Sequence, residues 1–245
     1  MPGKFKTEAI VLRSIRYGEA DRVLHLYTTT RGRIGAIAKG VRRPRSRFGG
    51  RLEPFFRVDL VLHEGRGELS TVTAAHTVAA HPTLRSDGAA LDAAARGCDA
   101  VLRLCDSEEA NPAAYNLLCR YLSILDGSES VAGDGAGDGA TGLATALAFR
   151  LKLALTTGFA PELSSCARCG EGDGLAGFSG AAGGVVCDAC GGFALSGEAH
   201  GFMVDALGRP LAQAPTASPG ALRQAERAIG ETLEHHAHVQ LRAAA

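Results

Sequence analysis

The sequence predicts an α+β protein, with an N-terminal five-stranded OB-fold barrel followed by a mostly helical domain that carries a small four-cysteine zinc module. Three observations support this. Residues 5–76 are rich in alternating apolar and polar positions, residues 82–158 and 200–242 have helical periodicity, and two Cys-x-x-Cys pairs lie between the helical stretches. With 245 residues there is room for two domains, which we expect at 1–80 and 81–245.

The barrel prediction rests on short strands separated by tight turns. In the clearest strand, Phe56, Val58, Leu60 and Leu62 alternate with polar residues, which indicates a half-buried strand. The expected strands cover residues 8–16, 23–27, 34–38, 56–63 and 69–73. Five strands this close together favour a small barrel. Strand counting leaves an SH3-like barrel open as the alternative to an OB fold.

The helical domain is predicted from apolar spacing and capping residues. Apolar positions recur at helical spacing over 91–105, and Asn111-Pro112 is typical of a helix start. A helix is expected from Leu143 to Thr157, and Ser218-Pro219 indicates another start. Residues 126–142 (DGSESVAGDGAGDGATG) have almost nothing to bury, so we expect a flexible loop there.

The two Cys-x-x-Cys pairs have the spacing of a structural zinc site. Seventeen residues separate the pairs, and the expected ligands are Cys166, Cys169, Cys187 and Cys190. Four thiolates complete a tetrahedron around one Zn²⁺ per chain and leave no position for a catalytic water. The surrounding module, 164–193, has little apolar content, so metal binding would supply its folding free energy. A redox role is the less favoured alternative.

The remaining cysteines and the histidine cluster receive simpler interpretations. Cys98, Cys105 and Cys119 are expected in a helical core as small apolar residues. The histidines at 235–238 are expected on a solvated helix face. No stretch is long and apolar enough to span a bilayer, and the N-terminus does not have the pattern of a signal peptide.

The formal net charge of zero is a cancellation between two halves. Residues 1–80 hold fifteen basic and seven acidic residues, a net of +8, whereas residues 81–245 hold eleven basic and nineteen acidic residues, a net of −8. Such asymmetry favours a polyanionic partner for the N-terminal half.

The positive charge is concentrated in residues 42–51 (RRPRSRFGGR), hereafter the basic loop, which has five arginines and no acidic residue. Arginine-rich loops suit a phosphate backbone, and Phe48 could stack on a base. A solvated loop or a contact with an acidic protein remains the alternative. The candidate DNA-binding residues are Arg13, Arg16, Arg31, Arg33, Lys39, Arg42, Arg43, Arg45, Arg47 and Arg51.

No catalytic set is apparent, so we do not expect an enzyme. Two matches to G-x-G-x-x-G, at 137–142 and 172–177, do not follow a predicted strand and are expected by chance in a chain with 32 glycines. There is no P-loop and no G-x-S-x-G elbow.

Several segments together resemble the RecO recombination-mediator family. They are AIVLRSIRYGEADRVLHLYT, GRIGAIAKGVRRPRSRFGGRLEPF and GRGELSTVT in the barrel, then FRLKLALTTGFAPELSSCARCG and VVCDAC around the cysteines. The resemblance covers roughly residues 5–80 and 143–191, and it is weak over 126–142 and beyond 200.

This resemblance implies a bacterial DNA repair and recombination protein, cytoplasmic and associated with the nucleoid. It implies binding of single- and double-stranded DNA, annealing of complementary strands, and help in loading the RecA recombinase. The implied partners are RecR and the C-terminal tail of single-stranded-DNA-binding protein. Two other functions stay open from the residues alone: an RNA-binding or ribosome-assembly factor with a zinc ribbon, and a metal-dependent nucleic-acid hydrolase.

Overall fold

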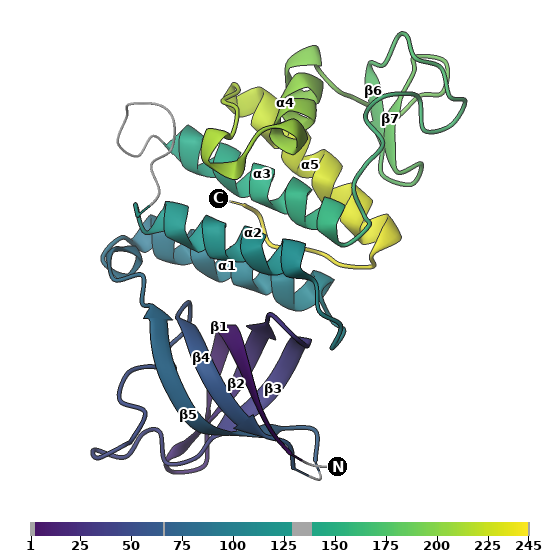
Figure 1. The fold of residues 1–245 in the computed structure, drawn as a ribbon. Coiled ribbons are helices and arrows are strands. Elements are labelled where there is room, and N and C mark those ends of the chain that lie inside the picture. The colour runs from purple at the N-terminus through teal and green to yellow at the C-terminus, as the bar shows by residue number, and fades with distance from the viewer. Residues whose placement is uncertain (1–2, 66, 129–138, 245) are drawn as a thin grey trace. The chain divides into compact units, whose positions relative to one another are not determined.

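The computed structural model describes residues 3–65, 67–128 and 139–244. The chain divides into two compact units, Met1–Gly127 and Ser128–Ala245. In its described part, the first unit contains a β-barrel and two α-helices, and the second contains three α-helices and a small sheet (Figure 1). In the described ranges, no helix combines the length and hydropathy that crossing a membrane requires.

The N-terminal sheet is a closed five-stranded barrel with the strand order of an OB fold. Neighbouring strands follow the order β1-β2-β3-β5-β4, and β4 closes back onto β1. The β3–β5 pairing is parallel, and the other pairings are antiparallel. The strands are β1 (Lys4–Tyr17), β2 (Asp21–Thr28), β3 (Gly32–Ala38), β4 (Arg57–His63) and β5 (Ser70–Ala79). The OB-fold prediction is therefore confirmed.

Strand β1 is long because it serves both walls of the barrel. Residues 4–10 pair with β4, and residues 9–17 pair with β2. The register shifts between Val11 and Arg13, a bulge that bends the strand from one wall into the other. The alternating apolar residues point inward, and Leu24, Leu26 and Leu62 are fully buried.

The connection between β3 and β4, residues 39–56, contributes two apolar side chains to the barrel core. It consists of successive turns, and Phe48 and Leu52 are each only 1% exposed within the barrel core. The expectation that Phe48 offers a ring for base stacking is therefore wrong. Its ring is used to complete a core that five short strands cannot fill alone.

Two helices pack over one end of the barrel (Figure 1). Helix α1 (Gly88–Leu104) begins at Asp87, whose carboxylate accepts hydrogen bonds from the N–H groups of residues 89 and 90. Helix α2 (Pro112–Leu125) begins at Asn111, as predicted, and this side chain caps the N–H of Ala114. Short 3₁₀ turn η1 (Thr83–Arg85) leads into α1. Cys98 and Cys105 are buried, as expected.

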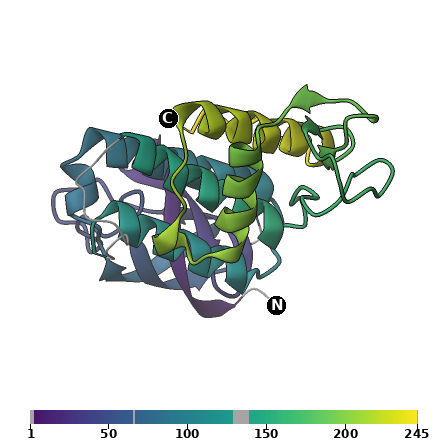
Figure 2. The ribbon, with the colours of Figure 1, turned by 90° about the horizontal axis from the view of Figure 1, so that it is seen from above.

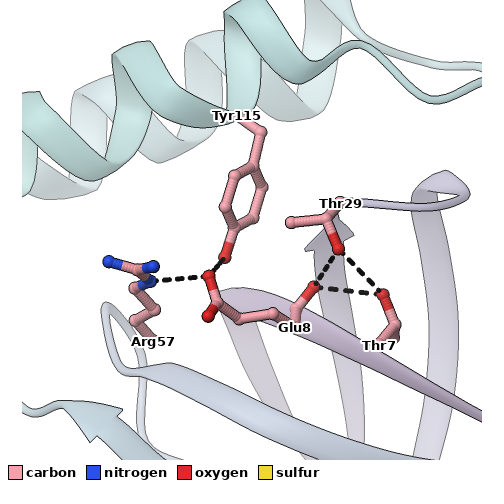
Figure 3. A network of polar contacts seen from close by, with 5 residues as sticks. All are labelled: Thr7, Glu8, Thr29, Arg57 and Tyr115. Carbon is pink, nitrogen blue, oxygen red and sulfur yellow. Dashed lines mark hydrogen bonds and ion pairs between the residues drawn. The ribbon is translucent and has the colours of Figure 1, made fainter.

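A polar network fastens α2 to the barrel (Figure 3). The Glu8 carboxylate accepts hydrogen bonds from Arg57 Nε at 2.7 Å and from the Tyr115 hydroxyl at 2.8 Å, and the carbonyl of Glu8 accepts from the hydroxyls of Thr7 and Thr29. Burial raises the pKa of Glu8, but the hydrogen bonds from Arg57 and Tyr115 outweigh it and hold the pKa below its ordinary value.

The second unit is built on three helices that contact one another: α3 (Gly139–Thr156), α4 (Gly197–Gly208) and α5 (Pro219–His236) (Figure 2). Ser196 and Ser218 cap α4 and α5. Between α3 and α4 lies a sheet of β6 (Gly177–Ser179), β7 (Gly184–Val186) and β8 (Phe193–Ala194), in the order β7-β6-β8. A second 3₁₀ turn, η2 (Leu211–Gln213), follows α4.

Helix α3 begins one turn earlier than the sequence indicated. Residues 139–142 belong to the helix rather than to the predicted loop of 126–142, and residues 129–138 of that loop lie outside the described residues. The loop was predicted because these residues have almost nothing to bury, but they directly precede a packed helix, and adding one turn to a helix that has already formed costs little free energy. From Ala144 to Leu151 every residue of α3 is buried.

Candidate nucleic-acid interface and metal centre

The basic loop starts at the end of the barrel that lies away from α1 and α2. Strand β3 begins near the end of α1, where Arg33 donates to the carbonyl of Leu102 at 2.9 Å. The strand then runs from Arg33 to its end at Ala38, and a strand rises about 3.3 Å per residue. The end of β3, which leads into the basic loop, therefore lies about 17 Å along the strand from that contact.

The connection that contains the basic loop is held against the hairpin between β1 and β2. The N–H of Gly40 donates to the Asp21 carboxylate at 2.7 Å, and the N–H of Arg42 donates to the carbonyl of Ala20 at 2.9 Å. Further along, Glu53 forms an ion pair with Arg22 of β2 at 3.0 Å. These contacts and the buried Phe48 fix the loop, so its arginines project from a supported surface.

Eight of the ten candidate cations are exposed to solvent. They are Arg13, Arg16, Lys39, Arg42, Arg43, Arg45, Arg47 and Arg51. Within the described residues, none of the five arginines of the basic loop forms an ion pair with an acidic side chain. Arg42 and Arg51 donate to backbone carbonyls, and Arg47 lies 4.8 Å from the centre of the Phe48 ring. Their charge is therefore available to an anionic ligand.

The other two candidates, Arg31 and Arg33, are half-buried and engaged within the protein. Arg31 lies over the ring of Phe5 at 4.0 Å and pairs with Glu64. Arg33 donates to the carbonyls of Leu102 and Asp106, each at 2.9 Å, and thereby fixes the end of α1 to the barrel. Sequence position alone could not separate these two from the exposed set.

On the outward face of β1 and β2, His25 lies near two arginines. His25 pairs with Arg13 across the two strands. Partial burial lowers the pKa of His25, and the nearby Arg13 and Arg33 lower it further. The two arginines therefore place positive charge near His25 on this face.

Sequence reasoning missed the exposed apolar residues on the same face. Tyr17 is 59% exposed and Ile15 is 41% exposed. These two residues flank Arg16 on β1. The available signal was the turn at Gly18: strand residues just before a turn are poorly covered, so an aromatic residue there is a candidate for contact with a ligand.

The four predicted metal-ligating cysteines come together in the second unit. The sulfur atoms of Cys166, Cys169, Cys187 and Cys190 all lie within 4.8 Å of one another. Each pair forms the same knuckle: Gly170 and Gly191 have φ of +79° and +71°, and their N–H groups donate back to the carbonyls of Cys166 and Cys187. This arrangement can hold a metal ion.

The closeness of the sulfur atoms shifts the pKa of two of these thiols in opposite directions. A hydrogen bond from the backbone of Cys187 lowers the pKa of Cys166 to about 6, while hydrogen bonding with Cys169 raises the pKa of Cys190 to about 12. Thiols this close share protons, and a dication that replaces those protons makes four thiolates compatible. His200 lies outside this group of cysteines, and its ring hydrogen-bonds to the carbonyl of Leu163 at 2.8 Å.

Comparison with known proteins identifies relatives along the whole chain. Residues 1–81 match the family model "Recombination protein O N terminal", and residues 85–244 match "Recombination protein O C terminal". The chain is 42% identical over 189 residues to "DNA repair protein RecO" of Rubrobacter xylanophilus, covering 76% of this chain and 71% of that protein. It is 37% identical over 244 residues to the protein of the same name from Frankia casuarinae, covering 98% and 96%.

Proposed function

The chain belongs to the RecO family of DNA repair proteins, and from this membership we propose that it is a recombination mediator that binds single- and double-stranded DNA and anneals complementary strands. On this proposal it works with RecR, contacts the tail of single-stranded-DNA-binding protein, and helps to load RecA at the nucleoid. It has no catalytic role of its own.

One observation carries the DNA-binding part of the proposal. Five arginines of the basic loop stand on an OB-fold barrel without acidic partners among the described residues, and the same barrel exposes Arg13, Arg16 and Lys39. OB folds commonly bind oligonucleotides on this kind of surface. The side chains proposed to touch phosphates are the eight exposed cations, while Arg31 and Arg33 contribute to the electrostatic field.

The mechanism is electrostatic. Cations that contact the phosphates of two strands lower the repulsion between those strands, so complementary bases can pair. Each neutralised phosphate releases counterions, and for single strands log Kobs changes by about −0.7 per contact with log salt concentration. We therefore expect affinity that depends steeply on salt and little on base sequence.

The test is fluorescence anisotropy of the full chain with labelled single-stranded DNA, duplex DNA and a structured RNA across a salt series. The proposal expects both DNA forms to bind with a negative salt slope and to resist competition by the RNA. Preference for the structured RNA would favour a ribosome-assembly factor instead. Cleavage of DNA in Mg²⁺ would indicate a hydrolase and contradict the non-catalytic role.

For the cysteine cluster we propose one structural Zn²⁺ per chain, held by Cys166, Cys169, Cys187 and Cys190. The Sγ atoms of Cys169 and Cys187 lie 3.7 Å apart. Tetrahedral coordination with Zn–S bonds of about 2.3 Å puts sulfur atoms about 3.8 Å apart. The four sulfurs complete the coordination, so the metal would order residues 164–193 rather than activate water.

Elemental analysis of protein purified without added metal tests this proposal. We expect about one zinc per chain in the natural sequence and a large loss of zinc in Cys169→Ser, together with increased proteolysis within residues 164–193. Cys119→Ser is the matched control, because this cysteine lies in α2 and outside the four-cysteine group. A chain that folds fully and contains no metal would contradict the proposal.

A further inference from the structure

The hairpin between β1 and β2 presents an aromatic ring that the fold does not use. Tyr17 is the most exposed of the large hydrophobic residues in the described structure, at 59%. Within the described residues its ring makes no stacking or cation–π contact, and its hydroxyl forms no hydrogen bond. Such exposure of a large apolar side chain costs solvation free energy, which a ligand would recover.

The hairpin that carries this ring contacts the start of the basic loop. The turn after Tyr17 supplies the carbonyls of Glu19 and Ala20, and both accept hydrogen bonds from Arg42, at 3.2 Å from its guanidinium and 2.9 Å from its N–H. Tyr17 also pairs across the hairpin with Asp21, whose carboxylate holds Gly40. The hairpin and the loop therefore form one surface.

The neighbours of Tyr17 on its own strand complete a strip of mixed character. Residues two apart on a strand share a face, so Arg13 and Ile15 lie on the same face as Tyr17, and Ile15 is 41% exposed. The cross-strand partner of Ile15 is Val23, which is half-buried. An apolar strip with an aromatic ring at one end and the cation of Arg13 at the other matches a nucleic-acid strand, which has both bases and phosphates.

We propose that Tyr17 is a stacking platform for an unpaired base of single-stranded nucleic acid whose phosphates contact the basic loop. This inference rests on the proposed function and adds a basis for distinguishing single strands from duplexes. The bases of a duplex are already stacked, so their faces are not available to the ring. Phosphate contacts serve both forms, whereas Tyr17 stabilises only the single-stranded one.

Substitution at Tyr17 separates stacking from electrostatics. Stacking of a base on an aromatic side chain is worth a change of about tenfold in affinity. We therefore expect Tyr17→Ala to weaken binding of a single-stranded oligonucleotide about tenfold and to leave duplex affinity within about twofold. The salt slope stays unchanged because no charge is removed. Tyr17→Phe keeps the ring and should retain single-strand affinity.

A direct signal is available because the chain contains no tryptophan. Tyr17→Trp places the single tryptophan of the chain at the proposed platform, and we expect a single-stranded oligonucleotide to quench its fluorescence much more than a duplex does. Val204→Trp is the control, since Val204 is 46% exposed on α4 in the other unit.

The outcomes separate this inference from the function on which it rests. The stacking platform alone is overturned if the chain binds DNA but Tyr17→Trp shows no quenching and Tyr17→Ala loses no affinity for single strands. This face would then be assigned to a contact with a protein. Absence of binding to any DNA overturns the proposed function and the platform together. Equal losses for single strands and duplexes in Tyr17→Ala also contradict the platform, because stacking acts on unpaired bases.

Discussion

Replacing Arg43 and Arg45 together is the most informative change in the basic loop. Both side chains are exposed, and neither makes a hydrogen bond, ion pair or ring contact in the described structure. Their removal therefore takes away positive charge and almost nothing else. The neighbouring Arg42, Arg47 and Arg51 all contact the protein, so substituting them would mix binding with folding.

The size of the effect follows from counterion release. If each of the two arginines neutralises one phosphate, Arg43→Ala/Arg45→Ala lowers the magnitude of the salt slope for single strands by about 1.4. At 0.1 M salt this corresponds to a loss of affinity of about 25-fold, and the loss shrinks towards zero near 1 M salt. The loss should be similar for oligonucleotides of different sequence, because phosphates carry no sequence information.

Anisotropy titrations at four or more salt concentrations give both affinity and slope. The control is Arg103→Ala/Arg209→Ala, which removes the same charge from two exposed arginines that pair with Asp99 and Asp205 on their own helices. We expect this control to bind like the natural chain. An unchanged slope in Arg43→Ala/Arg45→Ala, or an equal change in the control, would refute the assignment of the basic loop as a phosphate site.

Three further predictions concern the supports of this surface. Phe48→Ala should lower the free energy of unfolding by about 3–5 kcal/mol, because it leaves a cavity in the barrel core; a loss below 1 kcal/mol in urea unfolding would show that the ring is not a core residue. Glu8→Gln should cost about 2 kcal/mol at pH 7, because Arg57 and Tyr115 lose a charged acceptor. The folded-state pKa of Glu8 is lowered, so the contribution of Glu8 to stability is complete above its unfolded pKa of about 4.3 and is lost as the pH falls through the folded value. Between pH 3 and 7 the free energy of unfolding should therefore change less with pH in the variant than in the natural chain. Identical pH dependence of the two would contradict the network. Arg33→Ala should lower stability by about 1–2 kcal/mol through the two lost carbonyl contacts and should reduce the salt slope for DNA less than Arg43→Ala does; the reverse ranking would place Arg33 on the phosphate path.

The barrel and the cysteine cluster were predictable because each depends on local patterns. Alternation along residues 56–63 fixes which side chains face the core, and the closed sheet follows it. The two Cys-x-x-Cys pairs each form a tight turn, so bringing two pairs together suffices to gather the four sulfurs.

The site was harder to predict because it depends on contacts between distant residues. Phe48 lies among arginines and glycines, so nothing local shows that its ring enters the barrel. Arg33 meets carbonyls about 70 residues away, and Glu8 meets Tyr115 from α2. The early start of α3 was missed because residues 139–142 have little to bury themselves and are helical as an extension of the packed helix that follows.

Tyr17 shows a different limit. Strand periodicity assigns it to an outward face, but it cannot tell whether a neighbouring segment covers that face. Only the structure shows that the hairpin contacts the basic loop and still leaves the ring 59% exposed. Exposure of an aromatic residue is a property of the assembled surface.

The central claim, that the basic barrel surface makes this chain a mediator of strand annealing, is tested most directly by annealing complementary strands coated with single-stranded-DNA-binding protein. Pairing of labelled strands is followed by energy transfer, with the natural chain and with Arg43→Ala/Arg45→Ala at 0.1 M salt. We predict that at 0.1 M salt the natural chain accelerates pairing and that the variant loses most of this acceleration. At 1 M salt we expect neither protein to accelerate pairing. Annealing no faster than with the coating protein alone, or equal acceleration by the variant, would contradict the account.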